Sequence, residues 1–426
     1  MKNVMIRRSI AAVGATLLVA AVPACSQVTS GQPASTVKTS TVKIGAAFPL
    51  TGNLAFSGKR GLDGVNIAVE MINEDGGING KKVEVVSVDA ADTASAQSGA
   101  TRLVTQDKVS VVVGSTSSSI ASVSAPTVDR LGGFFWETSA IAPAVTGSGY
   151  KHVFRTITQS TGQGSFAADY IINNLAKQLN KEPSAINVGI LYTDDAYGAP
   201  IAKAEIETLK KANVNVPVIV PYQASSMRDF SPAILKLKQA KVDVTLHAAQ
   251  LPDAILFWRQ AKQAGLSLAA AGGTGSAYSE AGFPDALGKE INGVFNVVPP
   301  TPDSINIKML SAAAQKVLAR FQTKVKAKNL EPSSNMEWAF MGAWVLLHDV
   351  MPKAKDLTPD SLRTAALSID IAAKDTITGY GVKFDETGQN TKAFPVAQQW
   401  QDGALKTIFP KDLSVAATLT NRLPNS

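Results

Sequence analysis

A cluster of hydroxyl side chains follows one short apolar run of the sequence. The run is VSVVVG at 109–114, and STSSSIASVSAP follows it directly at 115–126. If a strand ends at 114 and a helix begins a few residues later, the free N–H groups of the first helical turn, with the hydroxyls of Ser117, Ser118 and Ser119, can hold a small anion such as a carboxylate. The alternative is that one serine simply caps the helix. The chemistry indicated is anion binding.

Two further strand ends carry residues of the same kind. GFFWET is followed by a turn that begins at Ser139, and NVGILYT is followed by Asp194, Asp195 and Tyr197. Adjacent acids point apart, so the acidic pair is expected to cap a turn. An aromatic ring at such a strand end is a candidate lid over an apolar ligand, and ordinary packing is the alternative for Tyr197.

The residues needed for catalysis are scarce. The three histidines, His152, His247 and His348, are far apart and form no HxxxH or HExxH pattern. The sequence contains no GxSxG elbow, no P-loop and no GxGxxG after a strand. We therefore expect no enzyme, no metal site and no cofactor.

The single cysteine, Cys25, stands in VPACS after a basic start and an apolar run at 10–24. This layout is that of a secretory signal, and the run is too short for a comfortable membrane span. A cysteine directly after the small residue resembles the lipobox of bacterial lipoproteins, although Val22 stands where leucine is usual. The resemblance implies cleavage before Cys25 and lipidation of its sulfur. A plain secretory signal with an incidental cysteine is the alternative. SQVTSGQPASTVKTS at 26–40 is typical of a flexible tether.

The charge of the chain is mildly basic. It has 41 Lys and Arg against 34 Asp and Glu, and cleavage before Cys25 would leave 38 against 34, a net charge of +4. Without a dense basic run, nucleic-acid binding has little support. A mature chain of about 400 residues exceeds the usual size of a single core, so two domains are expected.

Apolar Val- and Ile-rich runs alternate with amphipathic stretches up to about residue 300. This alternation predicts parallel sheets covered by helices on both faces, in which ligands bind beyond the carboxyl ends of the strands. The expected strands are 42–48, 82–89, 109–114, 133–138, 187–193, 216–222, 242–249 and 293–299, and the expected helices include 61–74, 95–107, 164–179, 231–241, 311–328 and 336–351.

An ordered set of segments resembles the branched-chain amino-acid/amide substrate-binding proteins of ABC importers. The segments are KIGAAFPLTGNLAFSGKRGLDGVNIAVEMINEDGGINGKKVEVVSVD, VVVGSTSSSIASVSAP, GILYTDDAYG, RDFSPAILKLK, FWRQAKQAGL and GVKFDETGQ…VAQQWQDG. The resemblance implies the type I periplasmic-binding fold, which is α/β with two doubly wound parallel-sheet lobes joined by a three-strand hinge that closes over the ligand.

The resemblance also implies a division of the chain, with crossings near 157–161, 297–301 and 378–381. The expected parts are a lipoprotein signal peptide at 1–24, a tether at 25–40, an N-terminal lobe at 41–158 and 299–378, a C-terminal lobe at 159–298 and 379–412, and a tail at 413–426.

Carried over from the family, the α-carboxylate of an amino-acid ligand would meet Ser118 and the backbone around Ser139 and Ile141. Ile141 stands where the family often has a hydroxyl, so only its amide would remain. Tyr197 would cover the ligand. Ser117 is a further candidate from the hydroxyl cluster.

Three further positions depart from the family pattern. Gln250 and Ser57 stand where an aromatic residue can occur, and Thr274 stands where amino-acid receptors place an acid for the α-ammonium. Because a buried ammonium needs a carboxylate or several acceptors, the departure at Thr274 admits amides and short or aromatic carboxylates as ligands. Glu280 and Asp253 are candidate replacements for the acid.

An apolar pocket lined by Trp136, Trp258 and Tyr278 is also possible, with core packing the expected role of each residue taken singly.

The function expected from the resemblance is that of an extracytoplasmic solute-binding lipoprotein, anchored to the outer face of the cell membrane by lipid at Cys25. It would deliver a small polar or carboxylate ligand to an ABC permease, act as a monomer and perform no reaction. A ligand sensor of the same fold that signals to a membrane partner is the alternative, and an exported enzyme is disfavoured.

Overall fold

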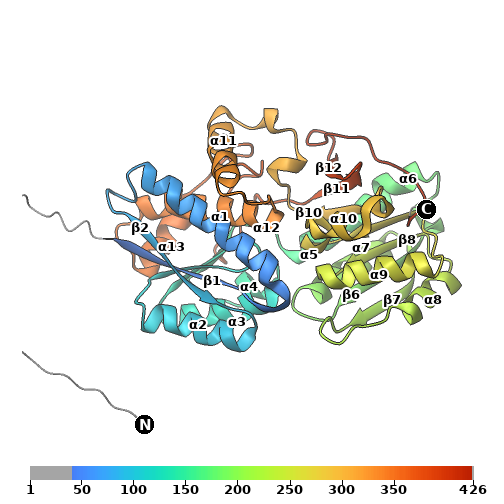
Figure 1. Cartoon of the computed structure of the whole chain (residues 1–426), viewed down its shortest axis with the longest axis horizontal. Helices are drawn as coiled ribbons and strands as arrows, with labels where there is room; N and C mark the ends of the chain where they lie inside the picture. Colours follow the sequence, from blue (N-terminus) through green and yellow to red (C-terminus); the bar gives the residue numbers. More distant parts are fainter. Residues whose placement is uncertain (1–40, 425–426) are drawn as a thin grey trace, which may run out of the picture. The chain divides into compact units, whose positions relative to one another are not determined.

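Two β-sheets with helices on both of their faces organise the chain (Figure 1). The computed structural model describes residues 41–424. The expectations for the signal peptide, for Cys25 and for the tether therefore lie outside the described residues. Among the helices of the described part, none is both long and apolar enough to cross a membrane.

The first sheet has five parallel strands in the order β2-β1-β3-β4-β5. Its strands are β1 (Val42–Phe48), β2 (Val83–Asp89), β3 (Val111–Gly114), β4 (Phe134–Glu137) and β5 (Val153–Arg155). Side chains alternate between the two faces of a strand, so Val111 and Val113 face one core while Val112 faces the other. Both faces are apolar, which is why β3 is a continuous run of valine.

Helices from two distant parts of the sequence cover this sheet. α2 (Thr93–Thr105) and α3 (Ser118–Arg130) pack on one face. The other face is covered by α1 (Ala55–Glu74), α11 (Ala312–Ala327) and α12 (Ser334–Trp344), and α13 (Pro359–Ser368) belongs to the same core. The short α4 (Ala144–Gly147) lies before β5. α1 and α12 approach closely because Gly64 has no side chain: a Cβ there would lie 2.2 Å from the carbonyl oxygen of Met336.

The second sheet has seven strands in the order β12-β11-β10-β9-β8-β6-β7. Its strands are β6 (Asn187–Thr193), β7 (Asn215–Tyr222), β8 (Val244–Ala248), β9 (Ala270–Gly273), β10 (Phe295–Val298), β11 (Val396–Gln401) and β12 (Ala404–Phe409). β6 to β10 are parallel, and β11 and β12 run antiparallel to their neighbours. The predicted architecture of two doubly wound lobes is confirmed, with this antiparallel edge as an addition.

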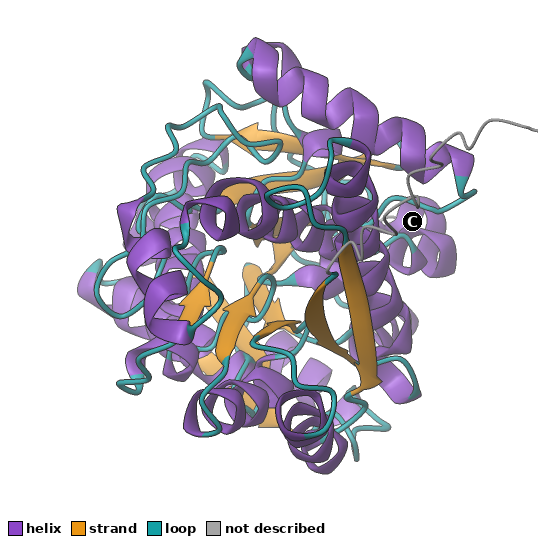
Figure 2. Ribbon diagram, turned by 90° about the vertical axis from the view of Figure 1, so that its left-hand side faces the viewer, coloured by secondary structure: helices purple, strands orange, loops and turns teal. Residues whose placement is uncertain are grey.

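Helices again lie on both faces of the second sheet. Figure 2, viewed from the side of the first lobe, shows strands surrounded by helices. α5 (Ser160–Tyr170) and α7 (Gly198–Lys211) share one core with the sheet, and α8 (Ser231–Gln239), α9 (Leu251–Gln263) and α10 (Gly282–Leu287) share the other. The predicted helix at 164–179 is α5 continued by a π-helical stretch (Ile171–Leu175) and α6 (Ala176–Gln178), and α12 continues into a second π-helical stretch (Val345–Val350).

The chain passes three times between the two sheets: after β5, after β10 and before β11. Tyr380, Val382 and Phe384 still pack in the core of the first sheet. The third crossing predicted at 378–381 is therefore placed too early, and we place it between Phe384 and Val396. The reason is that the segment GVKFDE, at 381–386, forms a loop of the first lobe, where Ile371 and Val382 form an isolated bridge.

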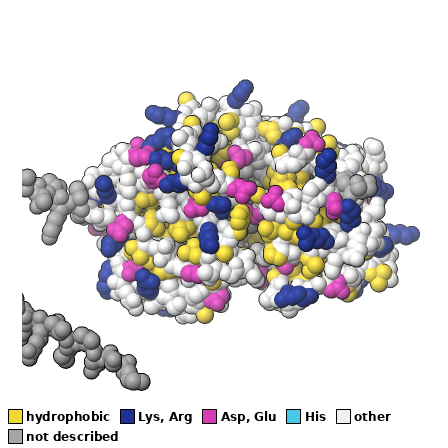
Figure 3. All heavy atoms as spheres, viewed as in Figure 1, with side chains coloured by type: hydrophobic (Ala, Val, Ile, Leu, Met, Phe, Trp, Pro, Cys, Tyr) yellow, Lys and Arg dark blue, Asp and Glu magenta, His cyan; other side chains and the backbone are white. Residues whose placement is uncertain are grey.

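Basic and acidic side chains are interspersed over the face of the molecule drawn in Figure 3. No broad region of one sign is seen on that face. The observation agrees with the mild net charge of the sequence.

Candidate functional site

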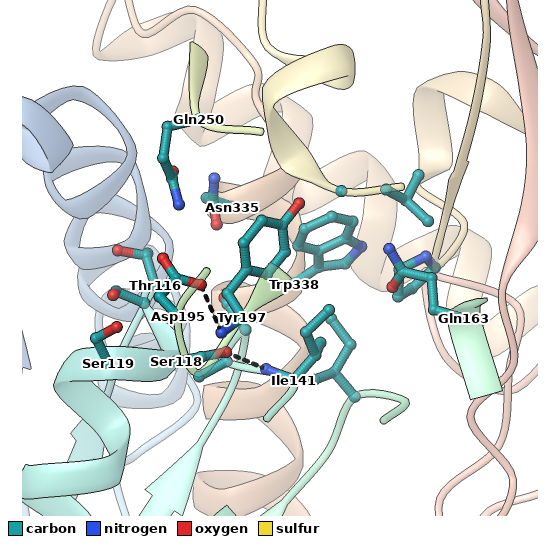
Figure 4. Close-up of a pocket in the computed structure, with 17 residues that line it drawn as sticks. Thr116, Ser118, Ser119, Ile141, Gln163, Asp195, Tyr197, Gln250, Asn335 and Trp338 are labelled. Carbon is teal, nitrogen blue, oxygen red and sulfur yellow. Dashed lines mark hydrogen bonds between the residues drawn. The ribbon is translucent and has the colours of Figure 1, made fainter. Parts of the chain in front are cut away.

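A cavity of about 50 Å³ lies where the two lobes meet (Figure 4). The lining residues come from both lobes and from the crossings: Thr116, Ser117, Ser118, Ser119, Ser139, Ala140, Ile141, Ile157, Gln163, Asp195, Tyr197, Gln250, Gly275, Val298, Pro299, Asn335 and Trp338.

The structure brings most of the predicted site residues to this cavity. The residues that line it are Ser117, Ser118, Ser139, Ile141, Tyr197 and Gln250. Thr274 is fully buried behind the lining, and its carbonyl oxygen accepts a hydrogen bond from the Tyr197 hydroxyl at 2.9 Å. Ser57 lies away from the cavity and donates to Glu280 at 3.5 Å. Trp136, Trp258 and Tyr278 are buried in the two cores and do not line the cavity.

The N-terminus of α3 opens onto the cavity. β3 ends at Gly114 and α3 begins at Ser118, and the side chain of Ser117, at the N-cap position, makes no capping hydrogen bond. The N–H groups of the first helical turn have no partner inside a helix. The positive end of the helix dipole adds to their attraction for an anion. The alternative in which this serine simply caps the helix with its side chain is therefore not observed for Ser117.

Ser118 is the best-defined polar group of the cavity. Its side-chain oxygen accepts hydrogen bonds from the backbone N–H groups of Ile141 at 3.2 Å and Ala142 at 3.1 Å. A hydroxyl carries a single hydrogen and two lone pairs. Because both lone pairs are occupied, the Ser118 hydroxyl can act toward a ligand only as a donor.

The turn that supplies these N–H groups is held from two sides. The carboxylate of Glu137 accepts from the N–H groups of Ser139 at 2.8 Å and Ala140 at 2.7 Å. The buried guanidinium of Arg155 donates to the carbonyl oxygen of Ala142 at 2.5 Å and to the side-chain oxygen of Gln389 at 2.7 Å. The turn is thus rigid before any ligand arrives.

The backbone around Ser139 and Ile141 is the other expected contact of the ligand carboxylate, and both residues line the cavity. In the structure their N–H groups donate to Glu137 and Ser118. They act by fixing the orientation of the Ser118 hydroxyl. Burial raises the pKa of Glu137 to about 7, and the backbone N–H groups that donate to it oppose that rise.

The second lobe presents Asp195 and Tyr197 between the end of β6 and the start of α7. Asp195 Oδ1 accepts from the N–H groups of Tyr197 and Gly198, both at 2.9 Å. The prediction that the acidic pair caps a turn is confirmed for Asp195. Asp195 also lines the cavity.

The ring of Tyr197 lies across the middle of the cavity (Figure 4). Its hydroxyl bond to Thr274 fixes that position, and Gly275 makes room for it: a Cβ on Gly275 would lie 1.6 Å from the Tyr197 hydroxyl oxygen. The ring can therefore cover a ligand while remaining anchored to its own lobe.

The lining residues that sequence reasoning missed include Gln163, Asp195 in this role, Asn335 and Trp338. Asn335 and Trp338 lie in α12, whose sequence reads as an apolar covering helix. Among the described residues, no cluster of three or more His, Cys, Asp or Glu side chains is arranged to hold a metal ion.

Neither candidate replacement for the acid missing at Thr274 lines the cavity. Asp253 accepts from the N–H of Gln250 at 3.4 Å at the start of α9. Glu280 is buried at the junction of the lobes, where it accepts from Asn335 at 2.5 Å and from Ser57 at 3.5 Å. Asn335 and Ser57 belong to helices of the first lobe, so Glu280 links the two lobes.

The Glu280 link should make stability depend on pH. Burial raises the pKa of Glu280 to about 7, so the folded state favours its protonated form. The contribution of Glu280 to the free energy of unfolding is therefore complete at low pH, where the residue is protonated in both states, and it is lost as pH rises through 7. Glu280→Gln should therefore be more stable, relative to wild type, at pH 8 than at pH 5 by about 1–3 kcal/mol. Urea unfolding at the two pH values measures the difference.

Wild type is the necessary reference because buried Glu137 and Glu205 also have raised pKa values, about 7 and about 8. The exposed Glu331→Gln serves as the matched control and should track wild type at both pH values. If the Glu280→Gln and wild-type stabilities change in parallel with pH, Glu280 does not titrate in this range.

Comparison with known proteins places this geometry in context. The sequence model of the family described as "Periplasmic binding protein" matches residues 41–404. The chain is 32% identical over 379 residues to "Leu/Ile/Val-binding protein homolog 8" of Brucella abortus, covering 88% of this chain and 92% of that protein. It is 32% identical over 384 residues to "Leu/Ile/Val-binding protein homolog 7" of Brucella suis, covering 90% and 94%.

Solved structures share the fold. The branched-chain amino acid transporter substrate-binding protein LivJ of Streptococcus pneumoniae, in complex with isoleucine, superposes with a TM-score of 0.73 at 26% identity, covering 87% of this chain and 100% of that one. A solute-binding protein of an ABC transporter from R. palustris, in complex with 4-hydroxybenzoate, gives a TM-score of 0.72 at 18% identity, covering 89% and 98%. The second likeness concerns the fold alone.

Proposed function

This chain belongs to the periplasmic binding protein family, and we propose that it captures a small carboxylate ligand between its lobes and delivers it to an ABC permease. Its relatives are substrate-binding proteins, so it is an extracytoplasmic solute-binding protein of the Leu/Ile/Val-binding type and not an enzyme. The ligand class, the delivery to a permease, the action as a monomer and the lipid anchor are our proposals.

The observation that carries the proposed ligand class is the Ser118 hydroxyl. Its oxygen accepts hydrogen bonds from two backbone N–H groups at the N-terminus of α3, so its own hydrogen is the part left to donate to a ligand. A carboxylate placed there accepts from the hydroxyl and from the first-turn N–H groups, and charged acceptors make the stronger hydrogen bonds. Isoleucine and 4-hydroxybenzoate, bound by two of the structural neighbours, share this group.

An α-amino acid remains a candidate ligand despite Thr274. An ammonium beside the carboxylate would meet the second oxygen of Asp195, which lines the same cavity. Asp195 would then be the acid that pairs with the α-ammonium, the role for which Glu280 and Asp253 were candidates. The proposed ligands are therefore small carboxylates, with or without an α-amino group.

A thermal-shift screen of refolded, ligand-free protein tests the proposal. The panel contains aliphatic amino acids, short and aromatic carboxylates, and the corresponding uncharged amides. A ligand at 100 times its Kd stabilises by about 2.7 kcal/mol, which should raise the midpoint by a few degrees. We expect shifts with one or more acids and none with its uncharged counterpart. Shifts confined to uncharged compounds would contradict the proposal.

The anchor is proposed from the sequence around Cys25, which lies outside the described residues. Cys25→Ser should remove the site of lipidation and move most of the protein from the membrane fraction to the soluble fraction, because the lipid is the proposed tie to the membrane. Immunoblotting of the two fractions measures it, with Ser35→Ala in the tether as control. Retention of Cys25→Ser in the membrane would show that the anchor assignment is wrong.

A further inference from the structure

Gln163 is a buried amide that the proposed carboxylate site does not use. It lies in the first turns of α5, is 1% exposed and lines the cavity. Neither its side-chain oxygen nor its side-chain nitrogen has a hydrogen-bond partner in the protein. A carboxamide offers two donors and one acceptor oxygen, and all of them are unpaired here.

The backbone of Gln163 and the polar group of a nearby lining residue are already engaged. Its backbone N–H is committed to the carbonyl of Gln159, which fixes the residue within its helix. The neighbouring lining residues Ile157 and Val298 are apolar, and the indole N–H of Trp338 already donates to the carbonyl of Pro300 at 3.3 Å. Because buried polar groups are nearly always paired with protein, ordered water or a bound molecule, the unpaired carboxamide is a candidate contact for a ligand in the cavity.

The position of Gln163 separates it from the carboxylate site. In Figure 4 it lies on the opposite side of the drawn site from Thr116, Ser118 and Ser119, with the rings of Tyr197 and Trp338 between them. The middle of the cavity is walled by a small apolar cluster that includes Ile141, Ile157, Val298 and Trp338. The cavity therefore has polar groups at both ends and an apolar middle.

We propose that Gln163 forms a second polar subsite, and that the ligand is a carboxylate with an apolar spacer and a hydrogen-bonding group at its far end. A hydroxyl or an amide fits best, because each donates and accepts as the carboxamide does. The inference rests on the proposed function. A ligand that ends in a methyl group leaves Gln163 buried and unpaired, so it should bind about 10- to 100-fold more weakly than its polar counterpart.

Calorimetric titration of the purified, ligand-stripped protein with matched pairs of acids tests the subsite. The probes are 5-hydroxypentanoate against hexanoate, and 4-hydroxybenzoate against 4-methylbenzoate. Wild type should prefer the polar member of the pair that fits, and Gln163→Met, which has similar length and no amide, should reduce the preference to within about threefold. Gln163→Leu replaces it if the methionine variant does not fold.

Gln250→Met is the matched control, since it removes an amide from the other side of the same cavity (Figure 4). It should change the affinity for both members of a pair alike and keep their ratio. Equal binding of the two members by wild type, or a preference that survives in Gln163→Met, would overturn the subsite while leaving carboxylate binding intact. Failure of every acid to bind would instead overturn the proposed function, and the subsite with it.

Discussion

Ser118→Ala is expected to lower the affinity for a carboxylate ligand by about 100-fold. Two effects combine in this change. The ligand loses its hydroxyl donor, and the N–H groups of Ile141 and Ala142 lose the oxygen that accepts from them. The second effect loosens the turn that carries the site, so the loss should exceed that of an ordinary hydrogen bond. Calorimetric titration with the acid that gives the largest thermal shift measures it.

Ser122→Ala is the matched control for this experiment. Ser122 is in the same helix, and its hydroxyl donates to the carbonyl of Ser118 at 2.7 Å without lining the cavity. It should bind the acid within about twofold of wild type, because it removes a hydroxyl beside Ser118 that does not line the cavity. If Ser118→Ala also retained near wild-type affinity, the carboxylate would not lie at the start of α3.

Glu137→Gln is expected to lower the free energy of unfolding by about 2–4 kcal/mol. One carboxylate oxygen accepts from the N–H groups of Ser115, Thr138, Ser139 and Ala140, and the other faces the N–H and hydroxyl of Ser115. Glutamine replaces one of these acceptors with an NH₂ group that would face another donor. Urea unfolding at neutral pH measures the loss.

The same substitution should weaken ligand binding, because the turn that orients Ser118 loses its fixed support. Glu84→Gln, an exposed change in β2 of the same sheet, should alter neither property. Retained stability in Glu137→Gln would mean that the carboxyl is protonated and that a neutral amide serves the turn equally well.

The sequence predicted the elements whose periodicity is strong. The β-branched runs of β1 and β6 match the expected 42–48 and 187–193. β5 and β9 are among the strands that were not predicted, because their local sequence carries little signal. β9 is AAGG, whose small residues make room for Phe295 and Tyr278, and β5 has only three residues. Their strand conformation is imposed by neighbours in the sheet and not by propensity.

The candidate site was predictable where one segment presents several polar groups. The serines before and within α3 are such a segment, and so is the turn with Tyr197. Asn335 and Trp338 were not predictable, because they reach the cavity only through the packing of α12 against α1, almost 300 residues earlier in the chain. Gln163 is likewise an ordinary helical residue in sequence, and only its burial without a partner marks it.

Titration of the refolded protein with the acid that gives the largest thermal shift, and with the primary amide of the same acid, tests the central claim most directly. The two compounds have nearly the same shape and differ in charge at the group that should meet Ser118 and the N-terminus of α3. We predict that the amide binds at least about 100-fold more weakly. Equal affinities for the two compounds would contradict the claim that the site recognises a carboxylate.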